Sequence, residues 1–400
     1  MPVELSALTQ PAPTRIVAVV IDGLGGFADA THGTELEEAS TPNLDRLAAG
    51  GISGLLEPVG PGVTPGSGPG HLALFGYDPQ EYELGRGALS AAGLGVEVRP
   101  GDVAARGNLA TLDRDGLVID RRAGRIDDES ARKVVAYLAE NVDVEGVDIV
   151  LTHEAQHRVL VVVRGPGLDP RVADTDPQAL GVTPRPPHAL TPHADHTARV
   201  IAEFDGQVRD LLQDFGSEAN CLLLRGFDTH RELPSMQARY GLNPAAIAVY
   251  PMYRGIAKLV GMKVLPKAAD LDDEVGLLRT HWDEHDYFFV HHKSADSAGE
   301  DGNFAAKVAA IEALDAVIPG IVDLEPDVLV VTGDHATPSQ MAAHSWHAVP
   351  AVLWGSRAGR DDVDRFGERW CRHGLLGLRP TKDLMPILLA CAGRLAKYGA

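Results

Sequence analysis

Long apolar runs and cysteines are both scarce in this sequence. No apolar stretch is long enough to span a bilayer, and residues 1–14 have neither the basic start nor the apolar segment of a secretion signal. The three cysteines are far apart and outside any C-x-x-C spacing, so they indicate neither a disulfide framework nor a thiolate metal site. We therefore expect a cytoplasmic protein with reduced thiols and no membrane partner.

Positive charge is also scarce. The 400 residues include 36 lysines and arginines against 56 aspartates and glutamates, which gives a formal net charge of -20. Nucleic acids and anionic membranes attract clustered positive charge, so neither is expected as a main partner. An acidic protein that handles an anionic substrate needs metal ions and a few local arginines to do so. The sequence does not indicate which oligomeric state the protein has.

Two kinds of region follow one another along the chain. Continuous β-branched runs such as residues 16–21 are typical of strands buried on both faces of a sheet, and predicted helices alternate with them. A middle section has shorter strands and one long returning helix. The predicted fold is an α/β core, residues 1–85 and 218–400, with a mostly parallel sheet flanked by helices, and a smaller α+β inserted domain, residues 86–217. Residues 221–226 are expected to form the first core strand after the insert.

Carboxylates and imidazoles follow the ends of three predicted strands and occupy one further loop. They are Asp22, Asp296, Glu300, Asp334, His335 and His344. In an open α/β sheet the carboxyl ends of the strands form the ligand-binding edge, so these side chains are expected to converge. Oxygen and nitrogen donors without thiolate suit two hard or borderline divalent ions such as Mn²⁺, Mg²⁺ or Zn²⁺. Each residue alone also fits a helix cap or a turn, and spacing leaves both interpretations open.

A glycine- and proline-rich loop, residues 60–71, places Ser67 just before a predicted helix. Glycines allow the backbone to approach a ligand closely, and the N–H groups at a helix N-terminus attract anions. Ser67 is therefore a candidate phosphoryl acceptor. The alternative is a loop without a catalytic role, because this composition is typical of loops in general.

Several motifs resemble those of known families. The segments 22–25, 41–45, 332–335 and 344–350 are similar to metal-binding signatures of the alkaline phosphatase superfamily. The segments 65–79, 119–126 and 174–177 resemble the archaeal-type 2,3-bisphosphoglycerate-independent phosphoglycerate mutases, and the match runs in order from Ile16 onward. The resemblance implies an alkaline-phosphatase-like core. It also implies an enzyme that interconverts 3-phosphoglycerate and 2-phosphoglycerate in glycolysis and gluconeogenesis.

The same resemblance assigns roles to the candidate residues. It makes Ser67 the nucleophile that is transiently phosphorylated. One divalent ion would be held by Asp22, Ser67, Asp334 and His335, and the other by Asp296, Glu300 and His344. Much of the family has a histidine where this chain has Glu300, and because glutamate is the harder ligand, Mn²⁺ or Mg²⁺ is expected rather than Zn²⁺. The alternative is that Asp301 or His347 replaces Glu300 as the ligand.

The inserted domain is expected to retain glycerate while it turns between two phosphoryl transfers. The candidate substrate-binding residues are Arg121, Arg122, Arg125, His157, Asp174 and Asp176. The arginines are expected to clamp a carboxylate or phosphate, and one of the other three residues to shuttle the hydroxyl proton. The alternative for the arginines is a solvated strand face paired with Asp127 and Asp128.

Other functions share parts of this pattern. A metal-dependent phosphomonoesterase would use the same serine and ions but pass the phosphoryl group to water, and fold alone does not decide between the two. A homoserine-kinase-like phosphotransferase is a second alternative, weakened by the absence of a G-x-x-x-x-G-K-[ST] loop. A binding protein without activity has no need of both a nucleophile and a full set of metal ligands.

Overall fold

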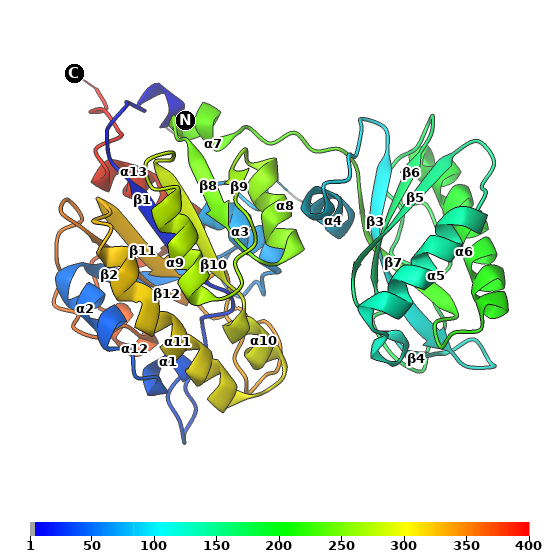
Figure 1. The fold of residues 1–400 in the computed structure, drawn as a ribbon, viewed down its shortest axis with the longest axis horizontal. Coiled ribbons are helices and arrows are strands. Elements are labelled where there is room, and N and C mark those ends of the chain that lie inside the picture. Colours follow the sequence, from blue (N-terminus) through cyan, green and yellow to red (C-terminus); the bar gives the residue numbers. More distant parts are fainter. Residues whose placement is uncertain (1–4, 83, 400) are drawn as a thin grey trace. The chain divides into compact units, whose positions relative to one another are not determined.

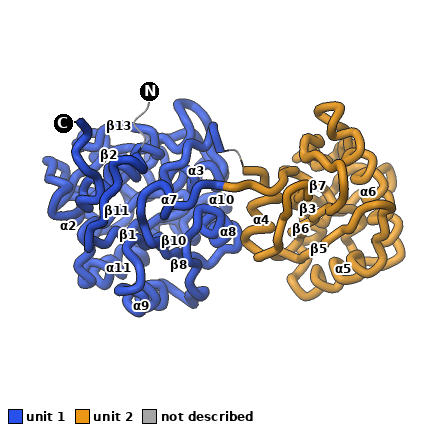
Figure 2. Tube along the Cα trace, turned by 90° about the horizontal axis from the view of Figure 1, so that it is seen from above, with its two compact units in different colours: residues 1–83, 233–400 blue, residues 84–232 orange. Residues whose placement is uncertain are grey.

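The computed structural model describes residues 5–82 and 84–399, and they divide into two compact units (Figure 1). Figure 2 colours the larger unit, residues 1–83 and 233–400, and the smaller unit, residues 84–232. Residues 1–4 and 83, which fall within the predicted core segment, lie outside the described residues.

The larger unit contains both short and long elements. Its strands are β1 (Ile16–Ile21), β2 (Ile52–Glu57), β8 (Pro244–Ile247), β9 (Lys263–Val264), β10 (Tyr287–His292), β11 (Val328–Thr332), β12 (Val349–Gly355) and β13 (Gly377–Pro380). Its α-helices are α1 (Glu35–Glu38), α2 (Pro42–Gly50), α3 (Ser67–Leu74), α7 (Met236–Tyr240), α8 (Pro251–Leu259), α9 (Leu271–Thr280), α10 (Ser294–Glu300), α11 (Phe304–Val322), α12 (Glu368–Cys371) and α13 (Leu384–Cys391). Two 3-10 helices are η1 (Leu5–Ala7) and η4 (Thr381–Asp383).

One eight-stranded sheet organises the larger unit, in the order β13-β2-β12-β11-β1-β10-β8-β9. β12 runs antiparallel to both of its neighbours, and the other neighbouring strands run parallel. The six residues of β1 are all apolar and all buried, because the strand is covered on both faces. The predicted α/β core with a mostly parallel sheet flanked by helices is confirmed.

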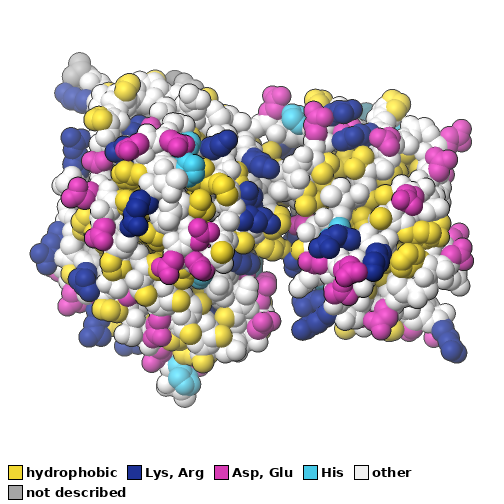
Figure 3. Space-filling model, viewed as in Figure 1, with side chains coloured by type: hydrophobic (Ala, Val, Ile, Leu, Met, Phe, Trp, Pro, Cys, Tyr) yellow, Lys and Arg dark blue, Asp and Glu magenta, His cyan; other side chains and the backbone are white. Residues whose placement is uncertain are grey.

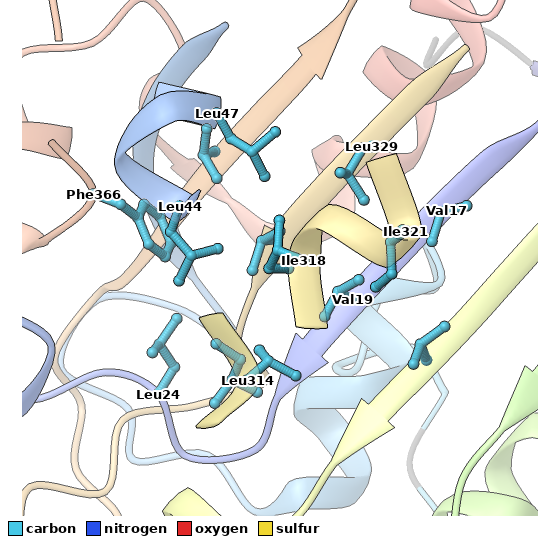
Figure 4. Close-up of a cluster of buried hydrophobic side chains, with 14 of the residues drawn as sticks. Val17, Val19, Leu24, Leu44, Leu47, Leu314, Ile318, Ile321, Leu329 and Phe366 are labelled. Atoms are coloured by element: carbon cyan, nitrogen blue, oxygen red, sulfur yellow. The ribbon is translucent and has the colours of Figure 1, made fainter. Parts of the chain in front are cut away.

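The two faces of this sheet bury different side chains. On one face, where α9 and α11 lie in Figure 1, Val19 of β1 packs with Leu314 and Ile318 of α11 (Figure 4). On the other face, Phe289 of β10 meets Phe75 at the end of α3, with ring centroids 5.0 Å apart and the rings perpendicular. Burying each such side chain contributes about 1.5–3 kcal/mol relative to leaving it exposed. These two layers fix α3 and β10 relative to β1.

The smaller unit is an antiparallel sheet with two long helices packed on one face and a shorter helix on the other. Its elements are α4 (Arg86–Leu94), β3 (Val103–Leu112), β4 (Val118–Asp120), η2 (Ala123–Arg125), α5 (Asp128–Asn141), β5 (Asp148–Ala155), β6 (Arg158–Arg164), η3 (Pro192–Ala194), α6 (Asp195–Phe215) and β7 (Cys221–Asp228). The strand order is β4-β3-β6-β5, with β7 on the other side of β3 from β6. Val161 of β6, Val134 of α5 and Phe204 of α6 lie in one buried cluster.

Strand β7 differs from the expectation drawn from the sequence. Residues 221–226 were predicted as a strand of the α/β core, but β7 pairs antiparallel with β3 and buries Leu222 and Leu224 against the helices of the smaller unit. The smaller unit therefore extends to residue 232 rather than ending at residue 217. A short apolar run predicts a buried strand, but it carries no information about which sheet the strand joins.

None of the helices within residues 5–82 and 84–399 is long and apolar enough to cross a membrane. On the face drawn in Figure 3, lysine and arginine side chains lie near aspartate and glutamate side chains on both units. A net negative charge therefore does not prevent local regions of positive charge.

Candidate metal centre

The candidate ligands come from the ends of neighbouring parallel strands. β1 lies between β10 and β11 in the sheet. The residue after β1 is Asp22, and the strand registers place it level with Lys293, just after β10, and with Asp334, two residues after β11. Because the carboxyl ends of parallel strands form one edge of a sheet, residues far apart in the sequence meet here.

Two of these carboxylates are fully buried. Asp22 and Asp334 each have 0% exposure. Asp334 Oδ1 accepts a hydrogen bond from the Gly23 N–H at 3.1 Å, but Asp334 Oδ2 and both oxygens of Asp22 accept none from the residues that the structure describes. Burying a carboxylate without a partner is costly unless a cation compensates it. Lys293 Nζ, 3.0 Å from Asp22 Oδ2, compensates part of this charge, and the remaining oxygens fit a hard divalent cation.

Histidine and carboxylate atoms form two adjacent groups of potential ligands. Asp22, Asp334 and His335 offer atoms within 4.8 Å of one another, and so do Asp296, His335 and His344. His335 belongs to both groups. Its Nε2 lies 3.3 Å from Asp22 Oδ1 and 3.2 Å from Asp334 Oδ2. The family resemblance implied that His335 holds one ion only, whereas the structure places it in both groups.

The pKa values of the carboxylates follow from this arrangement. Burial by itself would raise the pKa of Asp22, but the interaction with His291, 3.4 Å away, and the charge of Lys293 hold that pKa well below its usual value. Burial and the charge of Asp22 would likewise raise the pKa of Asp334, yet His335 and His71 lower it. Both carboxyl groups are therefore ionised and available to a cation.

The second group lies where α10 faces the loop before β12. Asp296 and Glu300 are four residues apart on α10, so their side chains project to the same side. His344 Nε2 is 3.6 Å from Asp296 Oδ1 and 3.6 Å from Glu300 Oε1. His344 Nδ1 lies 3.0 Å from the Pro65 carbonyl oxygen, which can only accept, so Nδ1 carries the proton and Nε2 faces the carboxylates.

The charge around His344 is strongly negative. Burial would lower the pKa of His344, but Glu300 and Asp296 raise it to about 9. The negative charge that favours a proton on this imidazole would also favour a divalent cation in place of that proton.

Glu300 is the most exposed of the predicted ligands. Its side chain is 56% exposed, and it stands outside the two groups defined above while remaining in reach of His344. Of the alternative ligands, Asp301 is exposed and follows α10, and His347 stacks on Phe27 with ring centroids 5.1 Å apart. Glu300 thus contacts His344 of the second group, whereas the ring of His347 stacks on Phe27.

Ser67 is the first residue of α3 and lies beside the first group. Its Oγ is 3.3 Å from His335 Nε2. One turn later, His71 Nδ1 lies 2.8 Å from the Ser67 carbonyl oxygen and 3.2 Å from Asp334 Oδ2. A Cβ atom at Gly70 would be 2.4 Å from the Asp334 carbonyl oxygen, so α3 can approach this loop only with glycine there. The glycine-rich composition of the loop therefore has a packing reason.

Lys293 connects the two groups and had no role predicted from the sequence. Its Nζ lies 3.0 Å from Asp22 Oδ2 and also pairs with Asp296. Burial would lower the pKa of Lys293, but these two carboxylates raise it, so the side chain is a permanent cation. The sequence did contain a signal for this role, because Lys293 precedes Asp296 by three residues, a spacing that brings side chains together on a helix.

In the smaller unit, Arg121 has a partner of its own. Its Nε and Nη2 donate to the two oxygens of the buried Asp176, at 3.0 and 2.6 Å. Burial would raise the pKa of Asp176, but the hydrogen bonds from Arg121 lower it. Asp174 accepts a hydrogen bond from the Gly226 N–H at 2.7 Å. Asp127, the partner considered from the sequence, instead caps α5.

The other predicted residues of the smaller unit differ in exposure. Arg122 and Arg125 are exposed, whereas His157 is buried. Burial and the charges of nearby arginines, Arg158 and Arg122 first among them, lower the pKa of His157 to about 4. His157 is therefore neutral at physiological pH.

Two further arginines lie on paired strands of this sheet. Arg106 of β3 and Arg225 of β7 are register partners, and Arg106 is 5% exposed. Burial and the charges of Arg106 and Arg86 lower the pKa of Arg225 to about 9. Sequence reasoning missed both residues, because an arginine within a strand usually points to solvent. The smaller unit thus carries a local cluster of arginines, although acidic residues outnumber basic ones in this unit as they do in the whole chain.

Comparisons with known proteins agree on one family. Residues 48–216 match the family model described as 2,3-bisphosphoglycerate-independent phosphoglycerate mutase. A probable enzyme of that name from Thermus thermophilus is 49% identical over 99% of this chain and 98% of its own length. Its counterpart from Aquifex aeolicus is 45% identical over 99% of each chain.

Solved structures agree with the sequence comparisons. A protein from Pyrococcus horikoshii has a TM-score of 0.83 and 28% identity, covering 97% of this chain and 99% of that one. The cofactor-independent phosphoglycerate mutase from Thermoplasma acidophilum has a TM-score of 0.70 and 29% identity, covering 95% and 100%. By its identity to relatives over nearly the full length, this chain belongs to the 2,3-bisphosphoglycerate-independent phosphoglycerate mutase family.

Proposed function

We propose that this protein interconverts 3-phosphoglycerate and 2-phosphoglycerate through a phosphorylated Ser67. Family membership supports the reaction. The observation that carries the role of Ser67 is its position at the start of α3, with Oγ 3.3 Å from His335 Nε2 and next to two buried carboxylates that each have an oxygen accepting no hydrogen bond. A hydroxyl placed this way can receive a phosphoryl group while neighbouring groups manage its proton and charge.

Two divalent ions would be held by residues of the larger unit. Asp22, Asp334, His335 and Ser67 would hold one ion, and Asp296, His344 and Glu300 the other. When bound, such ions lower the pKa of a serine hydroxyl and neutralise charge on a phosphoryl group. The preponderance of carboxylate oxygens favours Mn²⁺ or Mg²⁺ over Zn²⁺.

The reaction consists of two displacements at phosphorus. In the first, Ser67 Oγ loses its proton and forms a bond to the phosphorus of 3-phosphoglycerate. The bond between phosphorus and the C3 oxygen breaks, and that oxygen takes up a proton to give glycerate. In the second, the C2 hydroxyl oxygen of glycerate loses its proton and bonds to phosphorus, and Ser67 regains its proton as the serine ester breaks.

Residues of the smaller unit would bind the substrate anion. We assign this role to Arg122 and Arg125, which are exposed, and to Arg121, whose guanidinium is oriented by Asp176. His157 stays the predicted carrier of the hydroxyl proton, because a neutral imidazole can accept one, whereas Asp174 and Asp176 each already accept hydrogen bonds. A cytoplasmic location likewise stays a prediction.

A coupled assay tests the reaction. Purified protein is given 3-phosphoglycerate and Mn²⁺ without 2,3-bisphosphoglycerate, and enolase converts any 2-phosphoglycerate formed. We expect enolase product without release of inorganic phosphate. Inorganic phosphate alone would instead establish a phosphomonoesterase, and ATP-dependent phosphorylation of homoserine would establish the kinase-like alternative.

Substitution of Ser67 tests the nucleophile. Ser67→Ala should lower turnover by roughly 10⁴-fold or more, because the phosphoryl group then has no acceptor on the protein. Bound Mn²⁺, measured by elemental analysis, should remain largely intact. Ser40→Ala, at an exposed serine before α2, is the matched control and should keep full activity. Retained turnover in Ser67→Ala would contradict the assignment.

A further inference from the structure

Thr337 lies where three ligand-bearing segments of the larger unit meet. It follows Asp334 by three residues and is fully buried. Its N–H donates to the Gly25 carbonyl oxygen at 2.9 Å, and its own carbonyl oxygen accepts a hydrogen bond from Lys307 Nζ at 2.9 Å. Lys307 Nζ also donates to the Gly25 carbonyl oxygen at 3.0 Å. The backbone around Thr337 is therefore tied to the loop that follows Asp22.

The hydroxyl of Thr337 contacts Asp296 of the second group and His335, which belongs to both groups. Thr337 Oγ1 lies 2.6 Å from Asp296 Oδ1 and 3.0 Å from His335 Nδ1. A hydroxyl has one proton to donate, and an ionised carboxylate can only accept. The proton is thus directed to Asp296, and the hydroxyl oxygen accepts the N–H of His335 Nδ1.

This hydrogen bond selects one tautomer of His335. With the proton on Nδ1, the lone pair of the imidazole is on Nε2. Nε2 is the atom that faces Asp22 Oδ1 at 3.3 Å and Ser67 Oγ at 3.3 Å. A histidine that binds a cation through one nitrogen commonly donates its other N–H to a neighbouring acceptor, which fixes the ring.

Close packing leaves the side chain little freedom. A Cβ atom at Gly23 would be 2.6 Å from Thr337 Oγ1, and a Cβ atom at Gly299 would be 2.4 Å from the Thr337 carbonyl oxygen. Gly23 directly follows Asp22, and Gly299 directly precedes Glu300. Both ligand segments thus close on Thr337 at positions where only glycine fits.

We propose that Thr337 is a positioning residue that couples the two ion-binding groups, orienting Asp296 in one and setting the tautomer of His335 in the other. The inference rests on the ligand roles proposed above. It predicts that removal of a single hydroxyl weakens the binding of both ions, although Thr337 itself touches neither.

The test uses three variants and a binding measurement that needs no turnover. Thr337→Val removes the hydroxyl, and Thr337→Ser retains it. Thr332→Val is the matched control, because Thr332 is also fully buried but its hydroxyl donates to the Pro350 carbonyl oxygen at 2.9 Å. Protein stripped with a chelator is titrated with Mn²⁺ by calorimetry. We expect Thr337→Val to weaken both sites by about 10- to 100-fold, and the other two variants to bind as the unchanged protein does.

A spectroscopic measurement accompanies the titration. Long-range ¹H–¹⁵N spectra of histidine-labelled protein, at mildly alkaline pH and saturated with diamagnetic Mg²⁺, report which nitrogen of His335 carries the proton. We expect the proton on Nδ1 in the unchanged protein and in Thr337→Ser. This readout reports the hydrogen bond at His335 Nδ1 and does not depend on overall stability.

The outcomes separate the two proposals. If the unchanged protein binds no Mn²⁺, both the metal centre and the role of Thr337 are overturned. If it binds two ions and Thr337→Val loses no more affinity than Thr332→Val, only the role of Thr337 is overturned. Should Thr337→Val fail to fold, the tautomer in the unchanged protein decides, and a proton on Nε2 would overturn the proposal.

Discussion

Each unit of this protein contains a local cluster of like charges, acidic in the larger unit and basic in the smaller one, and the two clusters are built by different structural means. In the larger unit, Asp22, Asp334 and Asp296 are buried at the carboxyl ends of parallel strands, with Lys293 as their nearby cation. In the smaller unit, arginines cluster around an antiparallel sheet, and burial together with charges of like sign lowers the pKa of Arg225. A parallel sheet delivers loop residues to one edge, whereas an antiparallel sheet sets side chains side by side on its face.

The difference indicates what each unit can bind. Buried carboxylates favour cations, and neither Asp22 Oδ1 nor Asp334 Oδ2 accepts a hydrogen bond from the described residues. Clustered guanidinium groups favour carboxylate or phosphate. The proposed reaction would use both kinds of site, and this chain carries the two charge clusters in separate compact units.

Metal removal should produce the largest effect and should be confined to the larger unit. Mn²⁺ at about 100 times its dissociation constant is expected to raise the free energy of unfolding by about 2.7 kcal/mol for each bound ion. Hydrogen exchange followed by mass spectrometry, with and without a chelator, measures this separately for β11 and β6. If the chelator lowered the protection of β11 and β6 equally, metal binding would not be confined to the larger unit.

Loss of Arg121 should destabilise the smaller unit. Arg121→Ala leaves the fully buried carboxylate of Asp176 without its bidentate partner. Because Arg121 is about a quarter exposed, we expect a loss of roughly 2 kcal/mol rather than the larger value of a fully buried pair. Urea unfolding with hydrogen exchange on β4 and β7 measures it. Arg122→Ala, at an exposed arginine, is the control, and equal losses in both variants would show that the pair is not stabilising.

A buried carboxyl group without a cationic partner should have a raised pKa, in contrast to the lowered pKa of Asp176. Glu274 of α9 is buried, and burial together with the charges of Asp270 and Asp273 raises its pKa to about 8. The folded state therefore keeps a proton that the unfolded state releases above its own pKa, near 4.5. Stability is then lost as pH rises from about 4.5 to about 8, by roughly 1 kcal/mol for each pH unit near neutrality.

Substitution of Glu274 isolates this effect. Glu274→Gln should abolish this part of the pH dependence, which denaturant unfolding at a series of pH values would measure. The exposed Glu81→Gln should leave it in place. If the free energy of unfolding of Glu274→Gln fell with pH as steeply as before, the pH dependence would belong to other groups.

Sequence reasoning was most informative where the signal was local. The six apolar residues of β1 and the polar residues just after it predicted a buried strand and a carboxylate at its end, and the strand lies there. The same reasoning failed for β7, because its apolar run fits either sheet and only the pairing with β3 decides. Likewise, Arg121 was expected to bind substrate or to lie on a solvated face, and its bond to Asp176 depends on a contact 55 residues away.

By itself, the sequence determined the alternation of strands and helices, the carboxylates and imidazoles that follow the strands, and the motifs that resemble one family. These are properties of neighbouring residues, set by side-chain chemistry and periodicity. Only the tertiary structure decided that His335 lies between two ligand groups, that Glu300 stands at their exposed side, and that Thr337 contacts both. The physical reason is that strand order and register bring together segments from residue 22 to residue 344, and no local pattern encodes those distances.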